Sequence, residues 1–145
     1  MIEIRRPTKE DWPQLLELVH EFQKDTLNSM DMFCDDNIAY EVMNKHLDTS
    51  LVLLLDGKII GELYGFITNY FLSNALIYQT MSWFVTKRYR KYGVRLLKEL
   101  ERKCAEQNIK TIILSHINNK RVESLERFYA SCGYDLLETH YFKSL

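Results

Sequence analysis

The chain has 145 residues, of which 46% are hydrophobic, so its length and composition predict one globular domain over residues 1–145. Its 19 Lys and Arg nearly balance its 20 Asp and Glu, which argues against a nucleic-acid-binding protein because such proteins usually carry a strongly basic face. The longest apolar run, Leu51–Leu55, is far too short to cross a membrane, so no membrane partner is expected.

The cysteines and histidines argue against a disulfide-stabilised secreted protein and against a metal-binding protein. Three cysteines, Cys34, Cys104 and Cys132, make an odd number without Cys-x-x-Cys spacing, which favours a reducing compartment over a disulfide framework. The opening MIEIRRPTKEDW lacks the apolar stretch of a signal peptide. We therefore expect a cytoplasmic protein. The four histidines are scattered without ligand spacing, so no metal site is expected.

The N-terminal region predicts a short strand followed by a helix. Ile2 and Ile4 alternate with charged residues, which is the two-residue period of a strand. Thr8 is a suitable helix cap, and Asp11 stands three residues later in a box-like arrangement. Apolar side chains then recur at helical spacing, which predicts the first helix over residues 9–24.

A polar loop over residues 25–36 leads into a predicted second helix over residues 37–47. Three strands follow, and the Asp56-Gly57 pair after the first of them is a strong hairpin signal. The strands are expected at Leu51–Leu55, Ile59–Tyr70 and Leu76–Val85. Together they predict an antiparallel meander.

The remainder of the chain alternates between the two periods. Apolar residues at helical spacing predict a third helix from Gly93 to Gln107. A buried-type strand over Thr111–Leu114 and a helix over Asn119–Cys132 follow, and Gly133 has the place of a helix C-cap. Tyr134–Phe142 is expected to be extended and to form the last strand. The predicted order is β-α-α-β-β-β-α-β-α-β, a mixed α/β pattern.

The junction after Val85 is the best candidate for a ligand site. A strand ends there, a basic turn follows, and a helix begins at Gly93. The N-terminus of a helix carries unpaired N–H groups and the positive end of the helix dipole, so it favours a pyrophosphate. Glycine lets the backbone approach phosphates closely. The surrounding cations are Arg88, Arg90, Lys91 and Arg95. The alternative is a solvated basic turn before an ordinary helix.

This junction resembles the main motif of the GNAT N-acetyltransferase superfamily, Arg/Gln-x-x-Gly-x-Gly/Ala. Arg90 and Gly93 match its first two positions, whereas Arg95 stands where the family has a small residue. That arginine could crowd the pyrophosphate or bind it. The stretch from Phe128 to Tyr134 is similar to the family's C-terminal signature, Phe/Leu-Tyr-x-x-x-Gly-Phe/Tyr. The opening Ile4–Asp11 and the hairpin Asp56–Gly61 are similar too, so the resemblance spans nearly the whole chain.

The resemblance implies the GNAT acyl-CoA N-acyltransferase fold, a central and mostly antiparallel sheet with helices on both faces. It implies acetyl-CoA as acyl donor and direct attack by a deprotonated amine, with no covalent enzyme intermediate. The strand around Ser82 to Val85 would splay from its neighbour, pair with the pantetheine arm and help to polarise the thioester carbonyl. The implied cofactor-binding residues are Trp83, Phe84, Val85, Arg90, Lys91, Tyr92, Gly93, Val94, Arg95 and Asn119, with Asn118 as an alternative to Asn119.

The resemblance assigns a proton donor, but it leaves the identity of the general base undecided. Tyr129 matches the tyrosine that protonates the leaving thiolate, and a phenol suits that task because its ordinary pKa near 10 keeps it protonated at neutral pH. The alternative for Tyr129 is a core aromatic residue. Many members place a catalytic Glu on the central strands, yet Gln79–Ser82 holds no carboxylate. Glu62 and His116 are the candidate bases, and water-relayed deprotonation needs neither.

The acceptor amine is not defined by the sequence. A small polyamine-like or antibiotic amine and a lysine or N-terminus of a protein are all compatible with the family. The cluster Asp31, Asp35 and Asp36 could attract a cationic acceptor, although a solvated loop explains it as well. Dimers are common in the family, so a homodimer is one option. The rival functions are a non-catalytic GNAT-like module that binds CoA or a protein partner, and transfer of a longer acyl chain.

Overall fold

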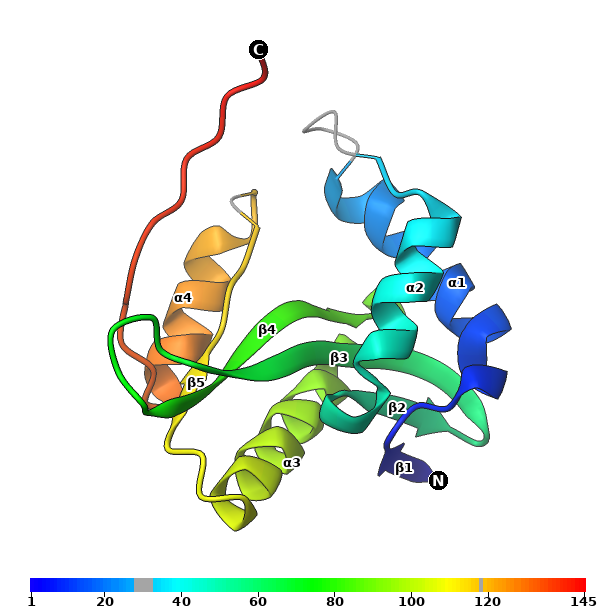
Figure 1. The fold of residues 1–145 in the computed structure, drawn as a ribbon. Helices are drawn as coiled ribbons and strands as arrows, with labels where there is room; N and C mark the ends of the chain where they lie inside the picture. Colours follow the sequence, from blue (N-terminus) through cyan, green and yellow to red (C-terminus); the bar gives the residue numbers. More distant parts are fainter. Residues whose placement is uncertain (28–32, 118) are drawn as a thin grey trace. The chain divides into compact units, whose positions relative to one another are not determined.

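The computed structural model describes residues 1–27, 33–117 and 119–145 (Figure 1). These residues group into two units, Met1–Ser115 and His116–Leu145. The larger unit contains the whole sheet, and the smaller one contains the last helix and the C-terminal segment.

Five strands form one sheet in the order β1-β2-β3-β4-β5. The first four are antiparallel neighbours, and β5 lies parallel to β4. Their bounds are Ile2–Arg5 (β1), Leu51–Leu55 (β2), Lys58–Asn69 (β3), Leu76–Val85 (β4) and Thr111–Ile113 (β5). The β2–β3 turn places Asp56 at φ 49° and Gly57 at φ 82°. Two successive left-handed residues are what a tight hairpin requires, so the predicted turn is confirmed.

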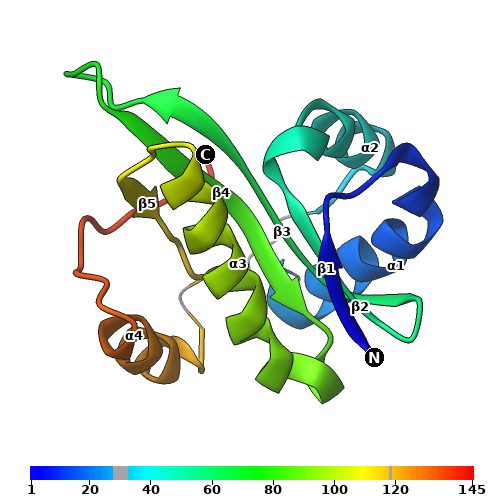
Figure 2. The ribbon, with the colours of Figure 1, turned by 90° about the horizontal axis from the view of Figure 1, so that it is seen from below.

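Helices cover both faces of the sheet, as the family resemblance implies. Figure 2 shows α1 and α2 on one face and α3 on the other. The helices are α1 (Trp12–Phe22), α2 (Asp36–Lys45), α3 (Gly93–Glu106) and α4 (Val122–Ser131). Short 3-10 helices are η1 (Lys9–Asp11), η4 (Leu47–Thr49) and η5 (Lys87–Tyr92), and a π-helix, η2 (Gln23–Leu27), extends α1.

The core consists of two apolar layers, one on each face of the sheet. On the α3 side, Leu51 and Leu53 pack with Leu96 and other buried residues. On the α1 side, Val52 packs with Leu15 and its neighbours. Successive residues of β2 therefore enter opposite layers. Both faces of this strand are covered, which explains why its sequence is a continuous apolar run instead of an alternating one.

In the smaller unit the helix begins three residues later than predicted and ends within one residue of the predicted limit. Asn119 Oδ1 accepts a hydrogen bond from the backbone N–H of Arg121 at 2.9 Å, and this turn delays the start of α4 to Val122. Gly133 has φ 87°, and Tyr134 N donates to Tyr129 O at 3.0 Å across it. The expected glycine C-cap is thus confirmed.

The last predicted strand, Tyr134–Phe142, is wrong. Residues 134–145 form no strand in the structure, and residues 135–145 are exposed. An extended segment becomes a strand only when its N–H and C=O groups pair with a neighbouring backbone, and no such pairing forms here. The observed order therefore ends at α4.

An ion pair between the half-buried Arg5 and the buried Asp11 ties β1 to the start of α1. The Arg5 guanidinium donates to both carboxylate oxygens of Asp11, at 2.7 and 2.8 Å, and Thr8 N donates to Asp11 Oδ2 at 2.8 Å. Asp11 is only 7% exposed. The hydrogen bond from Arg5 holds the pKa of this carboxyl below its ordinary value.

We expect Asp11→Ala to lower the free energy of unfolding by about 2 kcal/mol at pH 7, because hydrogen bonds to charged groups are lost. Urea unfolding measures this, with Glu17→Ala as a control that removes an exposed carboxylate from α1. The folded-state pKa of Asp11 is lowered, so its stabilisation is present above the unfolded pKa and is lost as the pH falls through the folded one. An equal loss in both variants at pH 7 would contradict the assignment.

Candidate functional site

The β4–β5 ladder is short, and β4 continues beyond it. Pairing with β5 covers Ile77–Gln79, and the Thr80 hydroxyl then donates to Ile113 O at 2.9 Å. β5 ends at Ile113, whereas β4 runs on to Val85. We call Met81–Val85 the β4 overhang. Its position agrees with the splayed strand that the family resemblance implies around Ser82.

A bulge marks the start of the overhang. Tyr64 pairs with Ser82 and Gly65 pairs with Thr80, so Met81 has no counterpart on β3. A Cβ built on Gly65 would lie 2.5 Å from Gln79 O, so only glycine fits beside β4 at this point. Bulges bend a strand and turn side chains, and they are frequent next to active sites. Here the bulge separates the part of β4 that pairs with β5 from the overhang.

The basic turn follows the overhang directly. Residues Lys87–Tyr92 form η5, and α3 begins at Gly93 as predicted. Lys91 Nζ and Arg95 Cζ lie 5.0 and 5.5 Å from the centre of the Tyr92 ring. The Arg95 guanidinium therefore lies beside the first turn of α3. Arg90 instead forms an ion pair, with its Nη2 3.8 Å from Asp25 Oδ2.

Gly93 allows α3 to begin close to β4. It has φ −58°, so no left-handed conformation is needed, and an added Cβ would contact Val85 Cγ2 at 3.4 Å and Trp83 Cζ2 at 3.7 Å. Val85 is buried in the α3-side layer and Phe84 in the α1-side layer. These two side chains fill the core, so at Phe84 and Val85 the overhang can offer a ligand mainly its backbone. Val94 is half-buried, one residue into α3.

Glu62 is a buried carboxyl on β3, on the sheet face covered by α1. It is 3% exposed, and its Oε1 accepts a hydrogen bond from Ser82 Oγ at 2.5 Å. Burial raises the pKa of Glu62 to about 7, against the opposing effect of the Ser82 hydrogen bond. Within the described residues, neither Glu62 Oε2 nor the buried Tyr64 hydroxyl has a hydrogen-bond partner. A carboxyl of this kind can exchange a proton near neutral pH.

Tyr129 and His116 lie together in the smaller unit. Their ring centres are 5.9 Å apart, and the Tyr134 ring lies 6.2 Å from that of Tyr129. Burial raises the pKa of Tyr129 to about 12, so its phenol stays protonated at neutral pH. His116 Nδ1 lies 3.4 Å from Ile117 O. Asn119 forms the turn before α4, and its alternative, Asn118, lies outside the described residues.

The acidic residues at the start of α2 have structural partners. Asp35 caps the helix by accepting from the N–H groups of Asn37 and Ile38, and Asp36 lies 2.9 Å from His20 Nε2. Asp31 lies outside the described residues. The two described carboxylates are therefore explained by helix capping and by a contact between α1 and α2.

Sequence reasoning missed three polar contacts around the site. They are Ser82 with Glu62, Thr86 with Glu21 at 2.9 Å, and Arg90 with Asp25. All three join residues far apart in the chain, and they depend on strand register and on the approach of α1 to the basic turn. No local spacing pattern could have revealed them.

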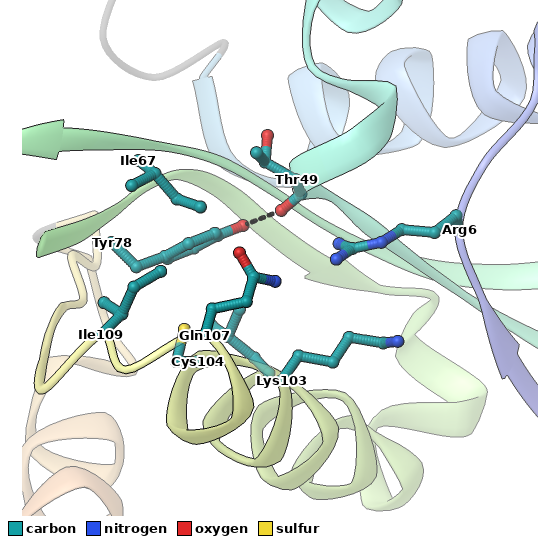
Figure 3. Close-up of a pocket in the computed structure, with 9 residues that line it drawn as sticks. Arg6, Thr49, Ile67, Tyr78, Lys103, Cys104, Gln107 and Ile109 are labelled. Atoms are coloured by element: carbon teal, nitrogen blue, oxygen red, sulfur yellow. Dashed lines mark hydrogen bonds between the residues drawn. The ribbon is translucent and has the colours of Figure 1, made fainter. Parts of the chain in front are cut away.

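A small pocket on the α3 side of the sheet is separate from these groups (Figure 3). Its lining includes the polar residues Arg6, Thr49, Tyr78, Lys103 and Gln107. Within it, the Tyr78 hydroxyl donates to Thr49 O at 2.6 Å. None of the predicted site residues belongs to its lining. Across residues 1–27, 33–117 and 119–145, no set of His, Cys, Asp or Glu is grouped to hold a metal ion. Over the same residues, no helix has the length and apolarity needed to span a membrane.

Comparisons with known proteins agree with this architecture. A model of the Acetyltransferase (GNAT) family matches residues 9–134. No curated protein matches the sequence significantly. Among solved structures, ribosomal-protein-alanine N-acetyltransferase from Brucella melitensis biovar Abortus 2308 is similar with a TM-score of 0.78 and 15% identity, covering 100% of this chain and 99% of that chain.

Two further structures share the fold. An aminoglycoside acetyltransferase from an uncultured soil metagenomic sample has a TM-score of 0.75 and 18% identity, covering 99% of this chain and 96% of that chain. Glucosamine-6-phosphate N-acetyltransferase from Arabidopsis thaliana has a TM-score of 0.69 and 20% identity, covering 99% of this chain and 98% of that chain. The shared feature is the fold, because the identities are low.

Proposed function

The chain belongs to the GNAT acetyltransferase family, and we propose that it transfers an acetyl group from acetyl-CoA to a primary amine. The observation that carries the proposal is the β4 overhang, which ends at a basic turn and the N-terminus of α3. The family match spans residues 9–134 and thus both units, so we propose that residues 1–145 act as one functional domain.

The residues present fit acetyl-CoA. The backbone of the overhang, at Trp83, Phe84 and Val85, is suited to pair with the amides of the pantetheine arm. The first turn of α3 offers N–H groups and a positive dipole to the pyrophosphate. The residues that would hold it are Arg90, Lys91, Tyr92, Gly93, Val94 and Arg95, and we keep Asn119 as a contact to the pantetheine arm. When bound, acetyl-CoA supplies an activated thioester carbonyl.

We assign the proton transfers to two groups. Glu62 is the proposed general base, because a buried carboxyl whose pKa lies near 7 is poised to take a proton at neutral pH. Tyr129 is the proposed general acid for the leaving thiolate, because its raised pKa keeps the phenol protonated. His116 is the second candidate base, since an imidazole nitrogen can accept a proton. The deprotonated amine attacks directly, with no covalent enzyme intermediate.

Three amines represent the acceptor classes. We choose sisomicin, glucosamine 6-phosphate and a peptide with an N-terminal alanine, because fold neighbours are bound to or named for amines of these kinds. We propose that the acceptor is such a small amine or a protein amine, in a cytoplasmic protein whose three cysteines are unpaired. Binding of acetyl-CoA without turnover of any of these amines would favour a non-catalytic module instead. A homodimer is also proposed, by family resemblance.

The cofactor assignment makes a specific prediction about Arg95. We expect Arg95→Gly to weaken acetyl-CoA binding about fivefold to tenfold, close to 1–1.4 kcal/mol, and to reduce the salt dependence of the affinity. The reason is that the guanidinium stands at the first turn of α3, where it can face the pyrophosphate.

Calorimetric titration with acetyl-CoA at two salt concentrations measures this effect. Lys98→Gly is the matched control, because it removes an exposed cation one turn further along α3. Tighter binding by Arg95→Gly would show that the arginine crowds the phosphates. Equal weakening in both variants would trace the effect to the helix instead of the site.

A further inference from the structure

Ser82 connects the buried Glu62 to the part of β4 that continues beyond the ladder with β5. The serine is half-buried and lies on the overhang, whereas Glu62 is almost fully covered. Tyr64 and Ser82 are directly opposite across β3 and β4, and Glu62 lies two residues before Tyr64. Side chains two residues apart on a strand share a face, so these three side chains lie on one face of the sheet.

The hydrogen bond between the two residues has a defined direction. The only hydroxyl proton of Ser82 points to Glu62 Oε1, at 2.5 Å between the oxygens. A serine oxygen has two lone pairs in addition to that proton. Ser82 Oγ can therefore accept a hydrogen bond from an ammonium or amine N–H while it donates to the carboxylate. Glu62 itself is covered and is poorly placed to receive an acceptor directly.

We propose that Ser82 is a catalytic residue that relays a proton from the acceptor ammonium to Glu62, an assignment that rests on the proposed function. An N–H bond of the ammonium breaks as an Oγ–H bond forms on Ser82. The original Oγ–H bond breaks as an O–H bond forms on Glu62 Oε1. The amine becomes neutral and nucleophilic, the carboxylate becomes a neutral acid, and the hydroxyl is regenerated.

In the described part of the chain, Ser82 is the side chain that forms a hydrogen bond with Glu62. From β3, Tyr64 faces it, and from β4 the pKa of Tyr78 also responds to its charge. On the α1 side, Leu15 and Leu18 are among the apolar residues packed there. Burial, and after it the charges of Glu62 and Asp11, raise the pKa of Tyr64. Among the described residues, no charged group contributes to the raised pKa of Glu62, whose first cause is burial. Burial raises the pKa of this carboxyl, and the Ser82 hydroxyl together with backbone hydrogen bonds at Phe84 and Tyr64 lowers it.

The test is the pH dependence of kcat for Ser82→Ala and Ser82→Thr. The profile is measured between about pH 6 and 9, the range in which a general base with a pKa near neutral changes its protonation state. The acceptor is whichever of sisomicin, glucosamine 6-phosphate or the alanine peptide the wild type acetylates fastest. Ser73→Ala is the control, because it removes an exposed hydroxyl that accepts from Ala75 N in the β3–β4 loop.

The relay predicts two changes in Ser82→Ala. The rising limb of the profile moves to higher pH, because the hydrogen bond that lowers the pKa of Glu62 is gone. The plateau at high pH also falls by about tenfold, less than the full loss of a general base because water can replace the hydroxyl. Ser82→Thr, which keeps a hydroxyl, recovers most of the plateau, and Ser73→Ala matches the wild type.

Different failures have different meanings. If Ser82→Ala reaches the wild-type plateau at high pH, the serine only tunes Glu62 and the relay is overturned while the proposed function stands. If Ser82→Thr is as slow as Ser82→Ala, the hydroxyl is not the active feature and the relay is again overturned. If the wild type binds acetyl-CoA and acetylates none of the three amines, the proposed function fails, and the relay fails with it.

Discussion

Replacing Glu62 with Gln is expected to lower kcat by about 10²–10³-fold, within the range for loss of a general base. The amide has nearly the shape of the carboxyl and can still accept from Ser82, but it cannot take a proton. The loss should be greatest above pH 7, where the wild-type carboxylate is ionised. Acetylation kinetics measured across pH with the fastest acceptor test this expectation.

The same substitution should make the protein more stable at alkaline pH. The folded-state pKa of Glu62 is raised to about 7, so the folded protein binds a proton more tightly than the unfolded chain. Ionisation of Glu62 therefore destabilises the fold as the pH rises from the ordinary pKa of 4.5 to the folded-state pKa of about 7. A shift of this size corresponds to about 3 kcal/mol, which Glu62→Gln should recover at pH 8 and not at pH 4. Urea unfolding at the two pH values measures the difference.

Two controls separate Glu62 from other carboxylates and from the second candidate base. Glu17→Gln removes an exposed carboxylate of α1 and should change neither kcat nor the pH dependence of stability. His116→Gln should leave the rising limb of the kcat profile in place if Glu62 is the base. Wild-type kcat in Glu62→Gln together with loss of the limb in His116→Gln would transfer the assignment to His116.

Replacing Tyr129 with Phe is expected to lower kcat by about 10²-fold, the low end for a general acid because water can partly substitute. The ring and its packing against His116 and Tyr134 are retained, so thermal stability and acetyl-CoA affinity should change little. The measurement is single-turnover kinetics, which isolates the chemical step from product release.

The control for Tyr129→Phe is Tyr141→Phe, which removes a phenol hydroxyl from a residue that is 93% exposed in the same unit. The control should behave as the wild type. A Tyr129→Phe enzyme with wild-type kcat would identify Tyr129 as a packing residue that happens to match the family signature. A large loss of stability would show that the hydroxyl is a structural group.

The parts of the fold that the sequence predicted best are bounded by strong local signals. The limits of Leu51–Leu55 and Leu76–Val85 are confirmed to the residue, and the start of α3 at Gly93 is confirmed as well. The Asp56-Gly57 turn ends the first strand, and the change from strand to helical period marks the start of α3. The C-terminal segment lacks such a constraint, and the strand predicted over Tyr134–Phe142 has no neighbouring backbone paired with it.

The candidate site was predictable as a sequence motif but not as an arrangement of side chains. The bulge at Met81 shifts the strand pairing by one residue, so simple alternation along β4 fails across it. Counting by two from Ser82 would place Tyr78 on the same face as Glu62, yet Tyr78 is buried in the α3-side layer. The Ser82–Glu62 hydrogen bond follows from strand register, which a single sequence does not reveal.

The most direct test of the proposed activity follows acetyl-CoA and the amine in one reaction. Purified protein is mixed with acetyl-CoA and each of sisomicin, glucosamine 6-phosphate and the alanine peptide. Free CoA thiol is measured colorimetrically, and the amine product is measured by mass spectrometry. We expect thiol release that depends on at least one amine and equals the acetylated amine mole for mole. Saturable binding of acetyl-CoA without amine-dependent thiol release for any of the three would contradict an acetyltransferase activity toward these acceptor classes.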